Sequence, residues 1–404
     1  MSPDPARANA RNALIAGFLG WTLDAFDFFV LTFVLIPVAH DFGKSIKDVA
    51  LTLTASLAMR PVGALIFGLM ADRWGRRLPL MIDVVFYSVV EVLSGFAPSY
   101  TVFFVFRLLY GIGMGGEWGV GASLAMESVP ARWRGLLSGL LQEGYACGFL
   151  LAAVAYGTVF PRFGWRALFF LGGAPALLTL FIRARVVEPE AWKDARADWP
   201  AYRRAVRKNL KLFGYLVLLM AMMNFISHGT QDLYPTFLQK ERHFDAAGTA
   251  FVTAISMIGA IAGGLLFGLI SDRWGRRRAM VTAIVGAILL VPLWIAAPAP
   301  ALVLAGAFGM QFMVQGAWGI IPAHINELSP APLRGFFPGF AYQVGVLCAS
   351  SIGYVEALLG EHLTYAQSMG ILAGSVLLLG AIVVAAGPEA HGVSFRAPVP
   401  EPPT

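Results

Sequence analysis

The sequence is poor in charged residues and in cysteine. Only 13% of its 404 residues are charged, whereas 57% are hydrophobic, and its two cysteines are Cys147 and Cys348. Soluble domains are about 25% charged, so the composition excludes an ordinary soluble domain. Both cysteines lie singly in apolar segments, which excludes a disulfide framework and a thiolate metal cluster. We therefore expect neither a metal nor a cofactor.

The chain also lacks the motifs of membrane-embedded enzymes. It contains no His-x-x-x-His pair and no Gly-x-Ser-x-Gly, the patterns that supply a metal site or an activated nucleophile. We therefore expect no enzymatic activity. A transporter-like sensor is a further alternative, but it would normally carry a signalling domain, and the polar ends of this chain are short.

Long hydrophobic runs fill most of the sequence, and the mean hydropathy is +0.68. A helix of about 20 apolar residues crosses the hydrocarbon layer of a bilayer. The runs are too long and too uniformly apolar for barrel strands. We predict an all-α polytopic membrane protein with twelve spans, at about 13–37, 49–71, 78–97, 100–126, 136–160, 164–183, 209–239, 247–271, 278–297, 300–327, 337–359 and 364–386.

Positive charge is concentrated on one side of these predicted spans. The net charge is +6, and most of the 30 Lys and Arg residues fall in the ends of the chain and in alternate loops. By the positive-inside rule both termini are cytoplasmic, as in a protein of the bacterial inner membrane. Topology accounts for the basic balance, so we expect no nucleic-acid partner. The first span is too long, and too interrupted by Asp24 and Asp27, to be a cleaved signal.

A ten-residue motif occurs twice, 200 positions apart. "GLMADRWGRR" at 68–77 returns as "GLISDRWGRR" at 268–277. The same offset relates Trp118 to Trp318, Glu127 to Glu327 and Arg134 to Arg334. The repeat predicts two pseudo-symmetric six-helix bundles, with the divisions 1–183 for the first bundle, 184–208 for a cytoplasmic linker, 209–387 for the second bundle and 388–404 for a cytoplasmic tail.

Each repeated loop joins the second and third spans of its bundle on the cytoplasmic side. Its Asp can accept hydrogen bonds or pair with cations, and its Arg residues are attracted to an anionic membrane surface. The alternative is that the arginines only set orientation, but topology alone does not require this pattern. We predict gating roles for Asp72, Arg73, Arg76, Glu127, Arg134, Asp272, Arg273, Arg276, Glu327 and Arg334.

The repeated motif resembles the loop signature of the major facilitator superfamily of transporters, and the six-plus-six layout extends the resemblance over essentially the whole chain. Arg107, with its neighbouring glycines, resembles the Arg-and-glycine fourth helix of that superfamily. Pro189-Glu190 and Pro388-Glu389 resemble its cytoplasmic network of acids and bases. The glycine–proline pattern of many drug antiporters is missing from "LSGLLQEGYACG", which favours uptake over export. The resemblance implies a central cavity that opens alternately to each side.

Polar residues gather at mid-membrane positions in the first and seventh spans. An ionisable group within a span costs about 2.5–3.5 kcal/mol, so each one indicates a functional site. Asp24 and Asp27 lie 200 positions before Asn224 and Ser227. A helical face of the seventh span carries Asn224, His228, Gln231 and Asp232. The alternative is a hydrogen-bond network that only holds helices together.

The stretch "NFISHGTQDLYPT", residues 224–236, resembles the signature of the fungal lactate permease family and its bacterial relatives, which are proton symporters of short monocarboxylates. The Asp-x-x-Asp of the first span resembles the wider sialate:proton symporter family, which also contains sialic acid carriers. The short connection between the bundles favours lactate. The resemblance implies a proton-coupled importer of lactate, pyruvate or a similar acid, active as a monomer. A carrier of sialic acid or of another organic or aromatic acid is the alternative.

A carboxylate substrate in an apolar cavity needs a cation or several hydrogen-bond donors. We predict that Arg60 binds it, unless Arg60 is the fixed partner of a helix 1 aspartate. Glu143 either faces the cavity or pairs with an arginine, while Asp83 and Glu91 have no predicted role. The predicted substrate-binding residues are Arg60, Asn224, His228 and Gln231, and the predicted proton-coupling residues are Asp24, Asp27, Glu143, His228 and Asp232.

Overall fold

The computed structural model describes residues 5–195, 199–231, 234–349 and 363–395, and all regular secondary structure within these ranges is helical. Ten of the described helical segments are long and apolar enough to cross a membrane. Two more complete the expected twelve. One is α5 (Tyr100–Ser128), which is long but carries Arg107 and Glu117, and the other is α18 (Phe337–Ala349), after which the chain leaves the described ranges. The protein is therefore an all-α, multi-pass membrane protein.

The helices fall into two series at the offset of the sequence repeat, joined by α10 (Glu190–Ala195) and α11 (Trp199–Lys208). The first repeat contains α1 (Pro5–Phe33), α2 (Leu35–Asp41), α3 (Ile46–Trp74), α4 (Arg77–Gly95), α5, α6 (Arg134–Gln142), α7 (Gly144–Thr158), α8 (Phe160–Leu171) and α9 (Ala176–Arg185). The second repeat contains α12 (Leu210–Gln231), α13 (Tyr234–Lys240), α14 (Ala246–Trp274), α15 (Arg276–Ala296), α16 (Pro300–Trp318), α17 (Ile321–Leu328), α18 and α20 (Tyr365–Ala386).

Equivalent residues begin and end equivalent helices in the two repeats. The Ser45 side chain accepts a hydrogen bond from the backbone N–H of Asp48 at the start of α3, and Asp245 caps the start of α14 in the same way. Both helices stop at the glycine of the repeated motif. Gly75 and Gly275 have φ of 102° and 90°, a backbone region that only glycine occupies readily.

Several predicted spans are broken rather than continuous helices. The fifth breaks at Glu143, the sixth at residues 172–175 and the tenth at Gly319, just before Pro322. Glycine adjoins each break, and proline favours the first turn of a new helix. The break at Glu143 places this acid between the two repeats, beside Gly264 of α14.

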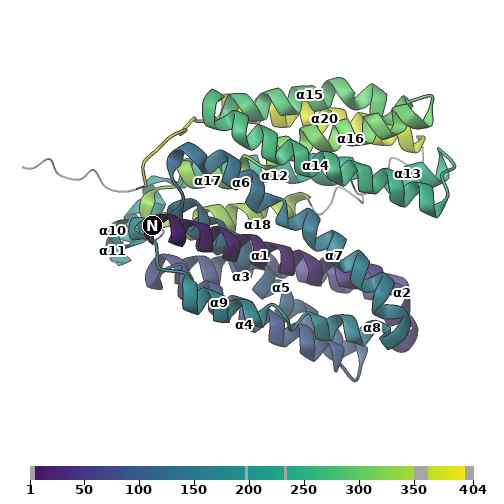
Figure 1. Ribbon diagram of the computed structural model, residues 1–404, viewed down its shortest axis with the longest axis horizontal. Helices are drawn as coiled ribbons and strands as arrows, with labels where there is room; N and C mark the ends of the chain where they lie inside the picture. The colour runs from purple at the N-terminus through teal and green to yellow at the C-terminus, as the bar shows by residue number, and fades with distance from the viewer. Residues whose placement is uncertain (1–4, 196–198, 232–233, 350–362, 396–404) are drawn as a thin grey trace, which may run out of the picture.

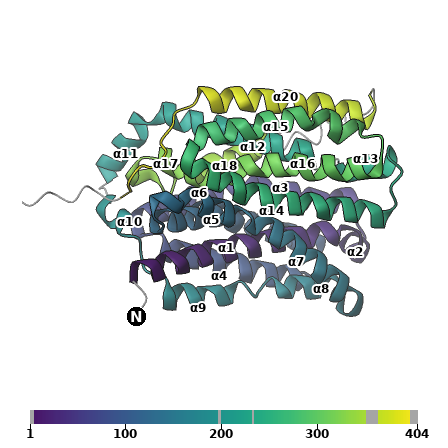
Figure 2. The same cartoon turned by 45° about the horizontal axis from the view of Figure 1, so that its top comes forward.

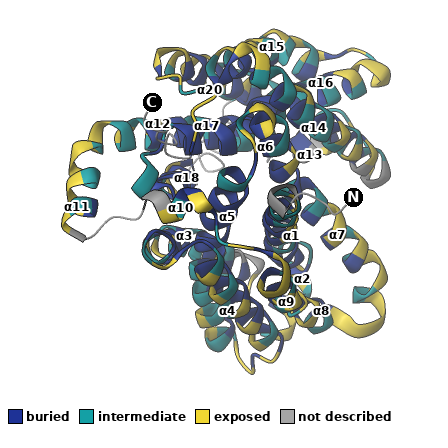
Figure 3. Ribbon diagram, turned by 60° about the vertical axis from the view of Figure 1, so that its left-hand side comes forward, coloured by how far each residue is buried: buried dark blue, intermediate teal, exposed yellow. Residues whose placement is uncertain are grey.

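The two repeats lie side by side with their helices along the long axis (Figure 1). Figure 2 shows the same arrangement from a second direction. Asn12 donates to the carbonyl of Arg185, and Arg134 donates to the carbonyl of Val393, at 2.8 and 3.0 Å. The described parts of both chain ends therefore lie at one end of the bundle, called here the termini end, which is on the left in Figure 1 and is turned toward the viewer in Figure 3.

The repeats pack closely at this end through glycines. A methyl group added to Gly119 would lie 2.5 Å from the Cα of Gly339, and one added to Gly268 would lie 2.5 Å from the carbonyl oxygen of Gly135. Such distances leave no room for a side chain, as expected where helices cross closely. The conformation is closed at the termini end.

Candidate functional site

A small cavity lies between the repeats, with a volume of about 60 Å³. A buried water needs roughly 10–15 Å³ of such volume, so the cavity holds a group of only a few heavy atoms. Its walls combine one cation, several amides and large aromatic rings. The lining residues include Arg60, Gln142, Asn224, His228, Gln315, Trp21, Tyr145, Trp318 and Tyr342.

Arg60 of α3 is the only arginine or lysine that lines this cavity in the described part of the chain. It is 4% exposed, and its guanidinium carbon lies 5.6 Å from the centre of the Tyr342 ring. Among the described residues, no carboxylate lies within 4 Å of its guanidinium, and its Nε and Nη2 lack hydrogen-bond partners. Buried charges are normally paired. The alternative role, a fixed ion pair with Asp24 or Asp27, is therefore not formed in this conformation.

The polar face of α12 is divided between two cavities. Asn224 and His228 line the small cavity, where Asn224 Nδ2 also donates to the carbonyl of Met220 at 2.8 Å. Gln231 lies farther toward the opposite end and donates to Gln311 Oε1 at 2.7 Å. The predicted proton site at Asp232 lies outside the described residues.

The second cavity, of about 190 Å³, is larger. It is lined by hydroxyl and amide groups of α12, α14 and α16 together with aromatic rings, namely Phe29, Tyr145, Phe149, Thr230, Gln231, Tyr234, Thr253, Ser256, Trp294 and Gln311. Tyr145 lines both cavities. Gln142, next to Glu143 in the sequence, was a candidate to face a cavity and does so, whereas the sequence did not single out Tyr145, Gln311 or Gln315. Gln311 and Gln315 could have been identified from the sequence, because they are two amides one helical turn apart within an apolar span.

Glu143 takes neither of its two predicted positions. It is 4% exposed, lines neither cavity and pairs with no arginine among the described residues. Instead, its Oε1 lies across the boundary between the repeats, 2.0 Å from where a methyl group on Gly264 of α14 would sit. Gln343, its equivalent in the second repeat, also reaches across and donates to the carbonyl of Gly115 at 3.3 Å.

The first repeat contains further buried acids away from the cavities. Glu91 of α4 forms an ion pair with Arg107 of α5, with Oε2 and Nη1 2.5 Å apart. Asp27 lies beside it, since Asp27 Oδ1 and Glu91 Cγ both approach the position of a side chain on Gly172. Neither carboxylate oxygen of Asp27 has a hydrogen-bond partner among the described residues. Glu91, which had no predicted role, is thus the partner of Arg107.

The first repeated loop contacts both the second repeat and the segment that connects the repeats. Asp72 Oδ1 accepts from Arg76 at 2.8 Å and from the backbone N–H of Gly335, in the second repeat, at 2.7 Å. Its Oδ2 accepts from Tyr202 of α11 at 3.0 Å. Arg76 also pairs with Glu127 at 2.9 Å. One aspartate therefore joins both repeats and the connecting segment.

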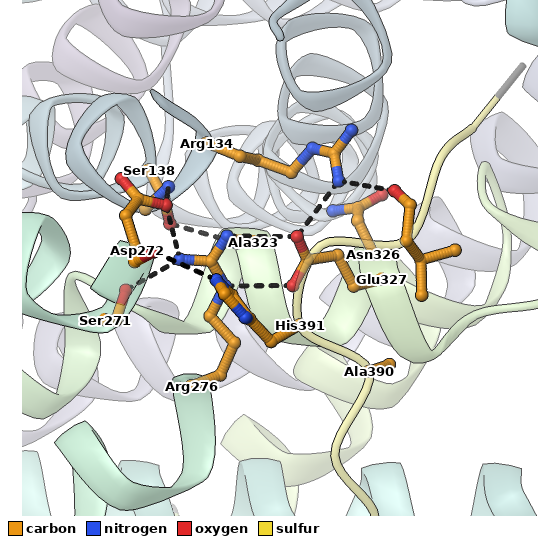
Figure 4. A network of polar contacts seen from close by, with 12 residues as sticks. Arg134, Ser138, Ser271, Asp272, Arg276, Ala323, Asn326, Glu327, Ala390 and His391 are labelled. Carbon is orange, nitrogen blue, oxygen red and sulfur yellow. Dashed lines mark hydrogen bonds and ion pairs between the residues drawn. The ribbon is translucent and has the colours of Figure 1, made fainter. Parts of the chain in front are cut away.

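The second repeated loop forms the matching network, shown in Figure 4. Glu327 pairs with Arg276 and with Arg134 of the first repeat, each at 2.9 Å. Asp272 accepts from the backbone N–H groups of Gly135 and Leu136, at 2.9 and 3.1 Å. These charged groups are buried, so the contacts are much less screened by salt than surface pairs.

The two networks differ at the arginine that follows each buried glutamate. Arg134 reaches Glu327, but Arg334 has no carboxylate within 4 Å among the described residues. Burial lowers the pKa of Arg334 to about 10. The Phe395 ring lies between the two guanidinium groups, 3.7 Å from Arg134 and 3.9 Å from Arg334.

The remaining two gate candidates are not brought into these networks. Arg73 is half-buried and Arg273 is exposed. Neither forms an ion pair or a hydrogen bond to another described residue. The gating role predicted for these two arginines therefore stays a prediction.

Acids from outside the bundles cap both loops. Glu389 accepts from the backbone N–H of Arg277 at 2.9 Å and from those of Ala390 and His391. Burial alone would raise its pKa, but these hydrogen bonds outweigh that effect and lower it. In the first repeat, Glu188 rather than the expected Glu190 accepts from the backbone of the motif arginines.

The sequence comparisons agree with this architecture. Residues 17–353 and 217–402 match the model of the Major Facilitator Superfamily. A carboxylic acid transporter protein homolog of Saccharomyces cerevisiae is 29% identical, covering 96% of this chain and 70% of the relative. The sialic acid transporter NanX of Escherichia coli is 29% identical over 89% of each chain. A probable 4-methylmuconolactone transporter of Cupriavidus pinatubonensis is 29% identical over 94% of this chain and 91% of the relative.

Solved structures confirm the fold. The proton:xylose symporter XylE superposes with a TM-score of 0.76 at 18% identity, covering 96% of this chain and 97% of that one. The human organic anion transporter MFSD10 gives 0.70 at 16% identity, covering 93% and 99%. The relatives are transporters and not enzymes. With two family matches spanning nearly all of its length, the chain is a transporter of the Major Facilitator Superfamily.

Proposed function

We propose that this transporter is a proton-coupled symporter that imports a short monocarboxylate, such as lactate or pyruvate, by alternating access. The observation that carries the proposal is Arg60, a buried cation in a cavity between the repeats that pairs with no carboxylate of the described residues. A bound carboxylate would neutralise it. The names of the relatives, which include transporters of carboxylic and sialic acids, support an organic acid as substrate.

The cavities suggest the order of binding. A substrate entering from the opposite end first meets the larger cavity, where Gln231 lies. Its carboxylate then reaches Arg60, with Asn224 and His228 as further contacts. The empty and the fully loaded carrier change conformation, since an unpaired charge in a closed cavity is costly. The loop networks at the termini end then separate.

The proton would be carried by a group close enough to respond to the charge of Arg60. Asp24 is the strongest candidate, because Arg60 acts on it electrostatically and Tyr110 donates to its backbone oxygen at 3.1 Å. Asp27, Glu143, His228 and Asp232 remain candidates on the grounds given by the sequence. A proton on Asp24 keeps this acid neutral while the substrate carboxylate pairs with Arg60.

We place the carrier in the bacterial inner membrane as a functional monomer, with the termini end in the cytoplasm. The positive-inside rule supports this orientation. We propose the division into bundles at 1–183 and 209–387, a linker at 184–208 and a tail at 388–404, which follows the repeat in the sequence.

Uptake of labelled lactate into proteoliposomes under an inward proton gradient tests this function directly. We expect concentrative uptake with the gradient and only equilibration without it. Concentrative uptake that persists without any gradient would contradict proton coupling. Failure of unlabelled lactate and pyruvate to compete would contradict the substrate.

A carrier of a larger organic or aromatic acid is the second candidate. The larger cavity, with five aromatic rings along its wall, favours it. So do relatives named for sialic acid, cis,cis-muconate and niacin. Competition of labelled uptake by a panel of these acids separates the two candidates, since the small cavity alone limits substrates to a few heavy atoms.

A further inference from the structure

The interior of the first repeat holds more acid than base. Asp24, Asp27, Asp83, Glu91 and Glu117 are all fully buried among α1, α4 and α5. The arginines buried with them are Arg60 and Arg107. Full ionisation would leave three uncompensated negative charges inside a membrane bundle, which is prohibitively unfavourable.

The contacts show which of these acids are uncompensated. Glu91 is paired with Arg107, and Arg60 is the cation that acts on Asp24. The other three, Asp27, Asp83 and Glu117, have no hydrogen-bond partner for either carboxylate oxygen among the described residues. A buried carboxyl group with neither an ion-pair partner nor a hydrogen-bond partner is stable only in its neutral form. Asp83 and Glu117 therefore hold protons in this conformation.

Packing does not require an acid at either position. The equivalents in the second repeat, 200 residues later, are Ala283 and Ala317, and both are fully buried. The helices that carry them, α15 and α16, match α4 and α5 in position along the chain. The same fold is thus built with alanine in one repeat and with costly carboxyl groups in the other, which points to a function for the acids.

The acids lie near one another, and two of them lie near Arg60, which lines the small cavity. Asp24 and Glu117 both interact electrostatically with Arg60. Glu117 Oε1 lies 2.2 Å from where a methyl group on Gly20 would sit, and Gly20 is one turn before Asp24 on α1. Asp83 interacts electrostatically with Glu117 and Asp24. It is six residues from the start of α4, or about 9 Å from the termini end at 1.5 Å per residue.

Two tyrosines lie among these acids and can pass protons between them. The rings of Tyr87 and Tyr110 are 6.3 Å apart. Tyr110 Oη lies 3.5 Å from Asp24 Oδ1, and the buried Tyr87 hydroxyl, which has no described partner, lies within the electrostatic reach of Asp24, Asp83 and Glu117. A hydroxyl group is both donor and acceptor, so it can relay a proton.

We infer that Asp24, Glu117 and Asp83 form a proton path through the interior of the first repeat, which leads from the Arg60 site to the termini end and is separate from the substrate route. The inference rests on the proton coupling in the proposed function. It adds Glu117 and Asp83 as proton-carrying residues to the proposed coupling site.

Each transport cycle moves one proton along this path and leaves no buried carboxylate without a cation. When the substrate carboxylate leaves Arg60, the Asp24 proton passes to Glu117, the Glu117 proton passes to Asp83, and the Asp83 proton passes to water at the termini end. Asp24 is then the carboxylate partner of Arg60, and Glu117 and Asp83 are neutral as before. Tyr87 and Tyr110 return to their starting state.

The proton path, like the substrate cavity, is closed to water at the termini end. Leu80 and Val84, on either side of Asp83, belong to one buried apolar cluster with Ile182 of α9 and with Val186, the residue that follows α9. This cluster separates Asp83 from water at the termini end. A single change of conformation that admits water there would open both routes together, as alternating access requires.

The test uses the full-length carrier with Asp83→Asn and Glu117→Gln, which mimic the neutral acids but cannot release a proton. We expect each to lower proton-driven lactate uptake by about tenfold or more. Exchange of external for internal lactate needs no net proton release and should stay within about twofold of the wild type. Asp83→Glu, which keeps the carboxyl group, should retain most of the driven uptake. Asp41→Asn removes an exposed acid at the opposite end and is the matched control.

Driven uptake that stays at the wild-type level in Asp83→Asn and Glu117→Gln would overturn the inference, because the acids would then be permanently protonated packing groups. Infrared spectroscopy supplies an independent readout if a variant fails to fold. The wild type should show carboxylic acid C=O bands at neutral pH that shift in D₂O, and absence of such bands would also overturn it. Absence of any lactate exchange by the wild type would instead contradict the proposed substrate.

Discussion

A single buried guanidinium group, that of Arg60, accounts for most of the chemistry proposed for the cavity. Its depth was predictable by counting residues from the "GLMADRWGRR" loop. Its isolation from Asp24 and Asp27 was not, because an ion pair depends on how α1 and α3 face each other. The same holds for Glu143, whose position between the repeats follows from a helix break that the apolar sequence did not reveal.

Arg60→Ala should raise the half-saturating lactate concentration by at least about thirtyfold, since loss of one partner of a buried charge pair costs about 2–5 kcal/mol. Arg60→Lys should retain part of the affinity, because it keeps the charge but not the two-pronged geometry. Initial rates of uptake over a range of lactate concentrations provide the measurement. An unchanged half-saturating concentration in Arg60→Ala would show that the carboxylate binds elsewhere.

Glu143→Gln should favour the conformation closed at the termini end. The backbone carbonyl oxygen of Gln315, the equivalent of Gly115, lies near the side chain of Glu143. Both oxygens are close to the position of a methyl group on Gly264, at 3.5 Å for Gln315 O and 2.0 Å for Glu143 Oε1. An amide at 143 can donate there, as Gln343 does to Gly115. A net gain of about 1 kcal/mol would shift the equilibrium roughly fivefold. Spin-label distances across the termini end should show this shift, and a shift toward the open state would contradict it.

At the scale of the elements, hydropathy predicted the spans but not their internal breaks. Breaks at Gly319 and at residues 172–175 depend on glycine and proline, which are tolerated in many membrane helices, so sequence alone did not locate them. In the chain segment after α20, the sequence indicated a contact role only for Pro388-Glu389. Residues 387–395 of this segment in fact contact both repeats, through Arg277, Asp272 and Arg134.

Phe395→Ala should loosen the closed termini end. The ring contacts one arginine of each repeat, and a cation–π contact contributes about 0.5–2 kcal/mol. Separation of the repeats breaks at least one of these contacts, so without the ring the closed state should lose at least about two- to thirtyfold in relative population. Labelling of a cysteine introduced at Ser123, buried at this closure, measures the opening. Phe395→Trp keeps the contact and is the control. Equal labelling rates in the alanine and tryptophan variants would show that the ring does not hold the repeats together.

At the scale of the whole molecule, the repeat predicted the pairing of two bundles and the place of their cavity. It could not predict which end is closed, because that depends on contacts between bundles rather than within them. Ser138 of α6 illustrates such a contact. Its hydroxyl donates to the carbonyl of Gly319 at 2.7 Å and accepts from the backbone N–H of Ala323 at 3.0 Å, both in the second repeat.

A disulfide between Ser138→Cys and Ala323→Cys should trap the closed state, after Cys147 and Cys348 are replaced by serine. We expect oxidation to abolish lactate uptake and reduction to restore it, because a covalent link stops the repeats from separating at this end. Each single cysteine variant serves as the control and should be insensitive to oxidant. Full uptake with the crosslink formed would show that this contact does not open during transport.

Four alanines of the second repeat stand where the first repeat has buried charged residues, and this difference bears on how the protein evolved. Ala260, Ala283, Ala307 and Ala317 occupy the positions of Arg60, Asp83, Arg107 and Glu117. Duplication of an ancestral six-helix unit supplied two copies of one scaffold, and a scaffold that tolerates alanine at these positions left the other copy free to specialise. An artificial carrier assembled from two second repeats should therefore assemble in the membrane and yet have lost its source of energy.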